Sequence, residues 1–109
     1  MAPDDDLARA LEELNAEYRA SLPQRMSDID AAWSSVKRGE GGAAGLHALL
    51  RALHSIAGSA PTFGMSALGD VAAVAETWIE PYYKRGEAPP SSVHGEFEPL
   101  LDAVKRAAA

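Results

Sequence analysis

Apolar residues recur at every third or fourth position along almost the whole of this 109-residue chain, and no stretch shows convincing strand-like alternation. This spacing places the apolar residues along one face of a helix. A chain of this length forms one domain and buries a single core without a metal or a disulfide, and this one has no cysteine. The pattern therefore predicts one all-α domain over residues 1–109.

Prolines and glycines divide the helical pattern into five segments. A first helix is expected over about 5–20, and Pro23 is expected to separate it from a second helix that ends near Gly39. Pro61 lacks the N–H that a helix needs, so the third helix should end or kink at Ala60. A fourth and a fifth helix complete the predicted order.

Short loops between amphipathic helices make those helices antiparallel neighbours, so the chain is expected to form a four-helix bundle. The bundle core should span about 22–106, with the additional N-terminal helix packed against it as a cap. Pro81 should bend or stop the fourth helix near its end. The residues predicted to face inward are Leu7, Leu11, Leu14, Tyr18, Leu22, Met26, Ile29, Trp33, Val36, Leu46, Leu49, Leu50, Leu53, Ile56, Ala60, Leu68, Val71, Ala75, Trp78, Tyr82, Val93, Phe97, Leu100, Leu101 and Val104.

The charge distribution narrows the classes of partner. A net charge of −6 argues against nucleic acid and anionic membranes, because binding to either needs clustered Lys and Arg. Neither cation occurs between Ala52 and Tyr83. No apolar run approaches the ~20 residues of a membrane span, and the N-terminus lacks the features of an export signal. We therefore expect a cytoplasmic protein with protein partners, and a monomer, because one bundle can account for most of the apolar stripes.

The most informative polar face lies on the third helix, where His47, Arg51, His54 and Gly58 follow at spacings of four, three and four. Glycine inside a helix costs about 0.5–1 kcal/mol relative to alanine, so Gly58 needs a reason. One possible reason is close contact between this helix and another. The other is access: a glycine four residues after His54 leaves one flank of the imidazole bare for a partner protein. We interpret His54 as a nucleophilic histidine displayed on a scaffold, since neutral imidazole is present near neutral pH.

A helical hairpin that turns near Phe63 and Gly64 would bring Glu76 opposite His54. A carboxylate that accepts from one ring N–H fixes the tautomer, frees the other nitrogen to attack and stabilises the cation formed during transfer. The sequence offers no second acid–base pair, no Gly-rich phosphate loop and no metal constellation, so we expect no independent enzyme, no metal site and no cofactor. His54 would instead accept a phosphoryl group and hand it on, while the partner supplies Mg²⁺.

Residues 54–65 read HSIAGSAPTFGM. This string is similar to the core of the histidine-containing phosphotransfer (HPt) domains of two-component phosphorelays, which is roughly His-x-x-Lys-Gly-small-Ala followed by a Gly. The run Thr62-Phe63-Gly64 is especially like the version in chemotaxis histidine kinases, and Glu76 falls at the spacing of its histidine-orienting glutamate. The resemblance implies that His54 is phosphorylated on its exposed ring nitrogen. It also implies exchange of that group with the Asp of a response-regulator receiver domain or with a histidine kinase.

A partner-binding face around the histidine follows from the same resemblance. Because binding would be modest and reversible, we expect apolar residues near the ring and polar groups around them. The residues predicted to take part in binding are Arg51, Ala57, Gly58, Phe63 and Gly64.

Two positions depart from the family pattern. Ala57 stands where the family usually has a lysine that is thought to help hold the phosphate, and Arg51, on the same face, is a candidate substitute. Pro61 replaces a more usual small residue. The sequence therefore favours a phosphorelay intermediate that carries phosphate on His54. The alternative is a phosphotransfer-inactive module that binds a receiver or a kinase without chemistry.

Overall fold

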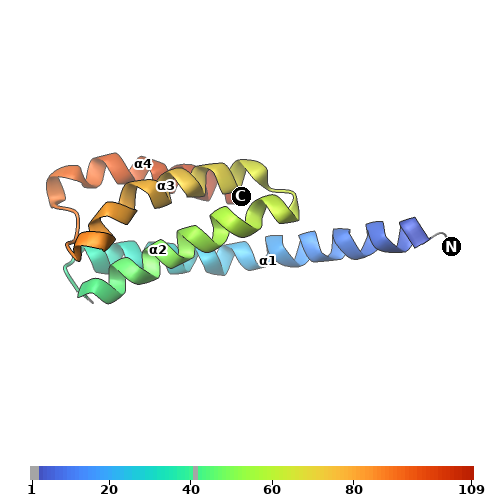
Figure 1. The fold of residues 1–109 in the computed structure, drawn as a ribbon, viewed down its shortest axis with the longest axis horizontal. Coiled ribbons are helices and arrows are strands. Elements are labelled where there is room, and N and C mark those ends of the chain that lie inside the picture. The colour runs from blue at the N-terminus through green and yellow to red at the C-terminus, as the bar shows by residue number, and fades with distance from the viewer. Residues whose placement is uncertain (1–2, 41) are drawn as a thin grey trace.

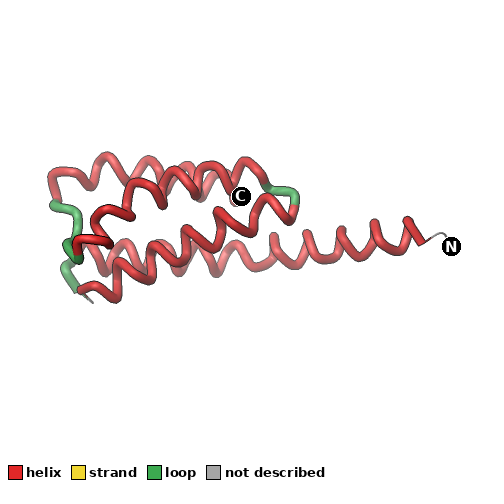
Figure 2. Tube along the Cα trace, in the orientation of Figure 1, coloured by secondary structure: helices red, strands yellow, loops and turns green. Residues whose placement is uncertain are grey.

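The computed structural model describes residues 3–40 and 42–109. Within these residues the chain forms four α-helices and two short 3₁₀-helices, with no strand (Figures 1 and 2). The predicted all-α bundle is confirmed. The elements are α1 (Pro3–Lys37), α2 (Gly42–Ser59), η1 (Ala60–Phe63), α3 (Ser66–Arg85), η2 (Ser91–Val93) and α4 (His94–Ala108).

The expected break at Pro23 is wrong, because α1 is one helix of 35 residues with Pro23 inside it. An interior proline removes one backbone hydrogen bond and costs about 3 kcal/mol. Here Pro23 is exposed, so the carbonyl that loses its donor can be hydrated. Leu22 and Ile29, on either side of it, are both buried in the bundle and hold the two parts of α1 on one line.

The N-terminal turns of α1 extend past the end of the bundle instead of folding back as a cap (Figure 1). Leu7, Leu11 and Leu14 are 60%, 50% and 47% exposed, whereas Tyr18, one turn further along the same stripe, is 6% exposed. The predicted inward position of these three leucines is therefore wrong. Their exposure also removes part of the reason for expecting a monomer, since the bundle does not cover this apolar stripe.

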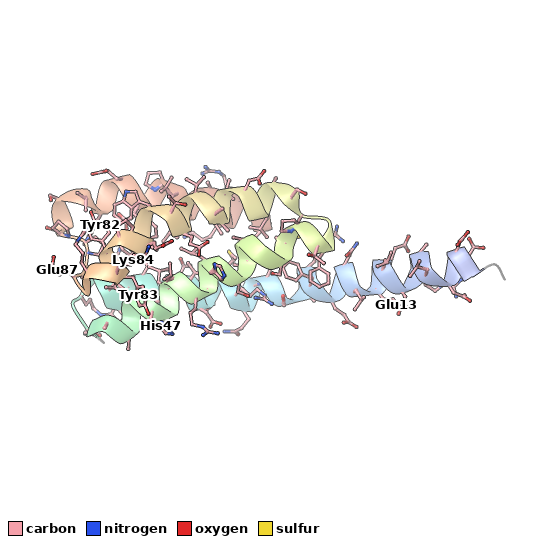
Figure 3. The ribbon with its side chains drawn as sticks, viewed as in Figure 1. Glu13, His47, Tyr82, Tyr83, Lys84 and Glu87 are labelled. Carbon is pink, nitrogen blue, oxygen red and sulfur yellow. The ribbon has the colours of Figure 1, made fainter. Side chains whose placement is uncertain are left out.

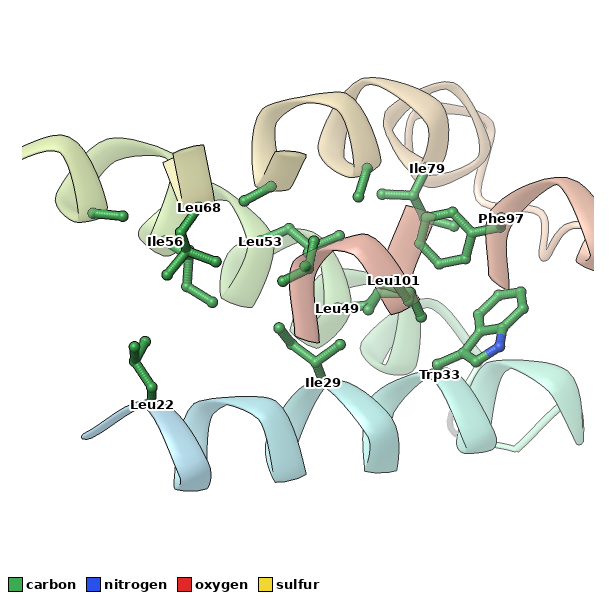
Figure 4. Packing of buried hydrophobic residues seen from close by; sticks show 14 of the residues in the cluster. Leu22, Ile29, Trp33, Leu49, Leu53, Ile56, Leu68, Ile79, Phe97 and Leu101 are labelled. Carbon is green, nitrogen blue, oxygen red and sulfur yellow. The ribbon is translucent and has the colours of Figure 1, made fainter. Parts of the chain in front are cut away.

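The core lies between the four helices and is built from their apolar stripes (Figure 4). On α2, Leu49, Leu53 and Ile56 are fully buried, at spacings of four and three. This burial fixes the rotation of α2 about its axis and turns residue 54 towards solvent. The other fully buried large side chains are Leu22, Ile29, Leu46, Leu68, Ile79, Phe97 and Val104.

The connection between α2 and α3 sets the register of the two helices that carry the candidate site. As predicted, α2 ends just before Pro61, and the 3₁₀-helix η1 takes over at Ala60. Gly64 then adopts a left-handed conformation with φ of 80°, which glycine enters at little cost. The amide of Met65 donates to the carbonyl of Ala60 and closes the turn. The two helices thereby return antiparallel to each other.

Pro81 does not stop α3, which runs on to Arg85 and ends at the left-handed Gly86. Pro81 is exposed, like Pro23, so water can again satisfy the carbonyl without a donor. The continued helix matters for the site because it keeps Tyr83 and Lys84 in helical register with Glu76. None of the described helices is long and apolar enough to span a bilayer.

Candidate functional site

His54 projects from the middle of α2 into solvent. Its side chain is 77% exposed, although the neighbouring Leu53 and the nearby Ile56 are fully buried. The apolar face of α2 is held in the core, so the imidazole is displayed on a rigid helix with most of its ring accessible. This arrangement agrees with the predicted outward orientation of His54.

Glu76 on α3 contacts the ring of His54, as the hairpin geometry predicts. The Nδ1 atom of His54 and the Oε2 atom of Glu76 are 2.5 Å apart. An ionised carboxylate has no proton to donate, so Nδ1–H donates to Glu76. In the neutral ring the lone pair then resides on Nε2. Glu76 is only 18% exposed, which limits how far it can move away from the ring.

The imidazole borders a hollow of about 470 Å³ between α2 and α3. On the α2 side the hollow is lined by Leu50, Arg51 and Ser55. Arg51 lies three residues before His54, on an adjacent strip of the helix, and places a guanidinium at the hollow. The structure therefore brings Arg51 together with His54, in agreement with its predicted place on the same face.

On the α3 side, Glu80, Tyr83 and Lys84 line the same hollow beside Glu76. Lys84 Nζ donates to Glu80 Oε1 over 2.8 Å, one helical turn away. The hydrogen bond with Glu80, followed by the charge of that carboxylate, raises the pKa of Lys84 above its ordinary value. The ammonium therefore stays charged at neutral pH.

Tyr83 and His47 mark the far end of this hairpin, where the two helices face each other again (Figure 3). The Tyr83 hydroxyl and His47 Nδ1 are 3.2 Å apart, and the rings are 5.6 Å apart between centroids. His47 lies seven residues before His54 on α2, and Tyr83 lies seven residues after Glu76 on α3. The pairs His47–Tyr83 and His54–Glu76 therefore belong to one antiparallel register. The surface between them is the candidate site.

Gly58 is exposed, and a Cβ built on it would meet no atom within 4 Å. Within the described chain, close helix–helix contact therefore does not explain this glycine, and the space beside it is open. Ala57 is half-buried and packs against the core, on the side of α2 that faces α3. It places no cation beside His54.

The structure does not bring Phe63 and Gly64 into the hollow beside His54. Phe63 stacks on Tyr18 of α1, with ring centroids 4.7 Å apart, and borders a separate hollow of about 260 Å³ that also contacts Leu14. Gly64 forms the left-handed turn that ends η1. Any role of the pair in partner binding would come from the end of the bundle, and stays a prediction.

Ser55 and Ser59 tie the site to α1. Arg25 Nη1 donates to Ser55 Oγ over 3.2 Å, and its guanidinium carbon lies 5.2 Å from the centre of the Tyr18 ring. The Tyr18 hydroxyl lies 2.8 Å from Ser59 Oγ, which itself donates to the Ser55 carbonyl. These contacts restrain the segment of α2 that carries His54.

The remaining histidine, His94, serves the packing of α4. Its Nε2–H donates to the carbonyl of Pro89 over 3.1 Å, and its ring meets Trp33 edge-on. Among residues 3–40 and 42–109, no three or more His, Cys, Asp or Glu side chains come together in a group that could hold a metal ion.

Glu80, Tyr83 and Lys84 are lining residues that the sequence argument missed. Their spacing of four, seven and eight from Glu76 was a usable signal, because residues at these intervals return to one helix face. Pro81 obscured it, since a helix that stops there would not carry Tyr83 and Lys84 in register.

A comparison with protein-family models matches residues 13–107 to the Hpt domain. Because the match covers most of the chain, the protein belongs to the Hpt domain family, and the predicted family is confirmed. It is a histidine phosphotransfer module of two-component phosphorelays, a class that works through phosphohistidine and interacts with receiver domains and kinases. No curated protein and no solved structure gave a significant match.

Proposed function

We propose that this protein is a phosphorelay intermediate that accepts and donates a phosphoryl group on Nε2 of His54. One observation carries the proposal: an exposed imidazole whose Nδ1–H donates to Glu76 over 2.5 Å. This contact leaves Nε2, the nitrogen with the lone pair, on the accessible side of the ring. The proposed partners are the aspartate of a receiver domain and a histidine kinase.

In the forward step, the Nε2 lone pair attacks the phosphorus of a receiver aspartyl phosphate in line with the leaving oxygen. The N–P bond forms as the bond from phosphorus to the aspartyl oxygen breaks, and the aspartate leaves as a carboxylate. No proton has to move. The imidazole gains a positive charge, and Glu76 stabilises it through the hydrogen bond at Nδ1. Donation is the reverse of this step.

The chain supplies a nucleophile and its orienting carboxylate, so we propose a phosphoryl carrier without independent enzymatic activity. We place the Mg²⁺ that such transfers use on the receiver, and propose no cofactor for this chain. The receiver would dock over the exposed face of α2, where Gly58 leaves the approach to His54 open.

The half-buried Ala57 supports a second candidate, a module that binds a receiver or kinase without transferring phosphate. An alanine at this position provides no cation that would help to hold a phosphoryl group. The substitution Ala57→Lys separates the two proposals. A carrier should transfer faster with the added lysine, whereas a binding module should gain no transfer.

The direct experiment incubates the chain with a panel of phosphorylated receivers and tests for acid-labile, base-stable phosphate on the protein. His54→Gln should abolish uptake with the helical fold intact. His47→Gln is the matched control, because it removes the other imidazole on the same face of α2. Uptake that persists in His54→Gln would contradict the site assignment. Receiver binding by His54→Gln, with no uptake by the wild-type chain, would favour the binding module.

A further inference from the structure

The hollow beside His54 is an unfavourable place for a phosphoryl group unless a cation accompanies it. A phosphoryl group brings about −1.5 to −2 charge at neutral pH. Two carboxylates, Glu76 and Glu80, already line this hollow, and among the described residues only one cation, Arg51, lies on its α2 side. Glu76 is matched by the positive ring of phosphorylated His54, but Glu80 would repel the phosphoryl oxygens if its charge were unbalanced.

Lys84 is placed to balance this charge. Its Nζ lies at Glu80 Oε1, and Glu80 is one turn from Glu76, which touches the ring of His54. Helix residues four apart have Cβ atoms roughly 5–6 Å apart, so Glu80, which holds the ammonium, is the neighbour of Glu76 on α3, although Lys84 itself is two turns from Glu76. The side chain is 71% exposed and has a flexible four-carbon stem, so its ammonium can reach a position between two anions.

We propose that, when His54 is phosphorylated, Lys84 reaches the phosphoryl oxygens while it stays beside Glu80, and that this cation between the two anions stabilises the phosphorylated form. This inference rests on the proposed phosphorylation of His54. It assigns a second cation to the site, on α3 and across the hollow from the nucleophile, in addition to Arg51 on α2. Lys84 thereby neutralises Glu80 in the resting protein and contacts the transferred group in the phosphorylated one.

The test compares Lys84→Met with Arg85→Met. Both remove one positive charge from the last turn of α3, but Arg85 lies over Tyr82 and borders a different hollow, on the face with Trp78. Each protein is phosphorylated without a receiver by phosphoramidate, and its ³¹P resonance is titrated with pH. A cation at the phosphoryl group favours its dianion, so Lys84→Met should raise the titration midpoint by about 0.2–0.7 pH units. Arg85→Met should leave it unchanged.

The same variants are then equilibrated with a receiver. Lys84→Met should lower the share of phosphate on His54 about two- to fivefold, and Lys84→Arg should restore it. Equal midpoints and equal partition in Lys84→Met and Arg85→Met would overturn the inference while leaving His54 as the carrier. A change in transfer rate alone would assign Lys84 to receiver docking and would also overturn it. A wild-type chain that takes up no phosphate from either donor would instead refute the proposed function, and the inference with it.

Discussion

Pro61 and Gly69 interlock where α2 passes to α3: a Cβ built on Gly69 would lie 2.7 Å from Cγ of Pro61. Real Cβ atoms do not approach so closely, so the proline ring occupies the space that a side chain on α3 would need. The fit lies in the hairpin that holds His54 opposite Glu76. It therefore helps to set the register of the site.

Gly69→Ala should destabilise the fold by about 1–3 kcal/mol, the usual cost of forcing an extra methyl group into a packed interior. Pro61→Ala makes room for that methyl group, so the double variant should recover much of the loss. Urea unfolding of the two single variants and the double variant gives the coupling energy. Strictly additive effects would show that the two residues do not interlock in solution.

Gly58→Ala should change stability and function in opposite directions. The added methyl group meets open space in the isolated protein, and alanine is the better helix former, so the free energy of unfolding should rise by about 0.5–1 kcal/mol. When a partner docks, the same methyl group would stand in its approach to His54, so phosphoryl transfer should slow. Gly95→Ala is the control, since its Cβ also meets no neighbour but lies on α4. If Gly58→Ala transfers as fast as Gly95→Ala, the access argument is wrong.

Glu76→Gln keeps the size of the side chain and an oxygen that can accept from Nδ1–H, but removes the charge. Phosphoryl transfer should fall by roughly tenfold, because the cationic ring loses its partner, and Glu76→Ala should lose more because the tautomer is no longer fixed. Single-turnover transfer from a phosphorylated receiver measures both. Glu96→Gln, an exposed carboxylate on α4, should have no effect. If both Glu76 variants transfer phosphate at the wild-type rate, Glu76 has no role in the site.

Glu98 gives the fold a defined pH dependence. The hydrogen bond from Lys37, and then the one from Trp33, lower the pKa of Glu98 below its ordinary value of 4.5. Since the folded-state pKa is the lower one, the ionised carboxylate stabilises the fold above pH 4.5, and this contribution is lost as pH falls below it. Urea unfolding at pH 7 should show Glu98→Gln less stable than wild type, and the gap should close in acid. A gap that stays constant down to pH 3 would contradict this account.

The sequence carried enough information for the bundle and for the His54–Glu76 pair. Both follow from the 3.6-residue period: buried Leu53 and Ile56 turn His54 outward, and a hairpin that turns at Gly64 brings Glu76 opposite. The period could not show whether a proline ends a helix. That depends on whether the carbonyl it leaves without a donor can reach water, which is a property of the folded surface. The break expected at Pro23 was wrong for this reason.

The effect of a proline on a helix also kept Lys84 out of the predicted site. With α3 expected to bend or stop at Pro81, Lys84 had no assigned face, although it lines the hollow beside His54. Phe63 and Gly64 show the opposite problem. They belong to the family-like string, yet they pack towards α1 because η1 turns the chain there. Nearness in sequence to His54 did not indicate nearness in space.

The most direct test of the central claim locates the phosphate itself. After incubation with a phosphorylated receiver, ³¹P–¹⁵N NMR or mass spectrometry of base-stabilised peptides should place a single phosphoryl group on Nε2 of His54. His47→Gln should keep that label and His54→Gln should lose it. Phosphate on Nδ1, on another residue, or on His54→Gln would contradict the account.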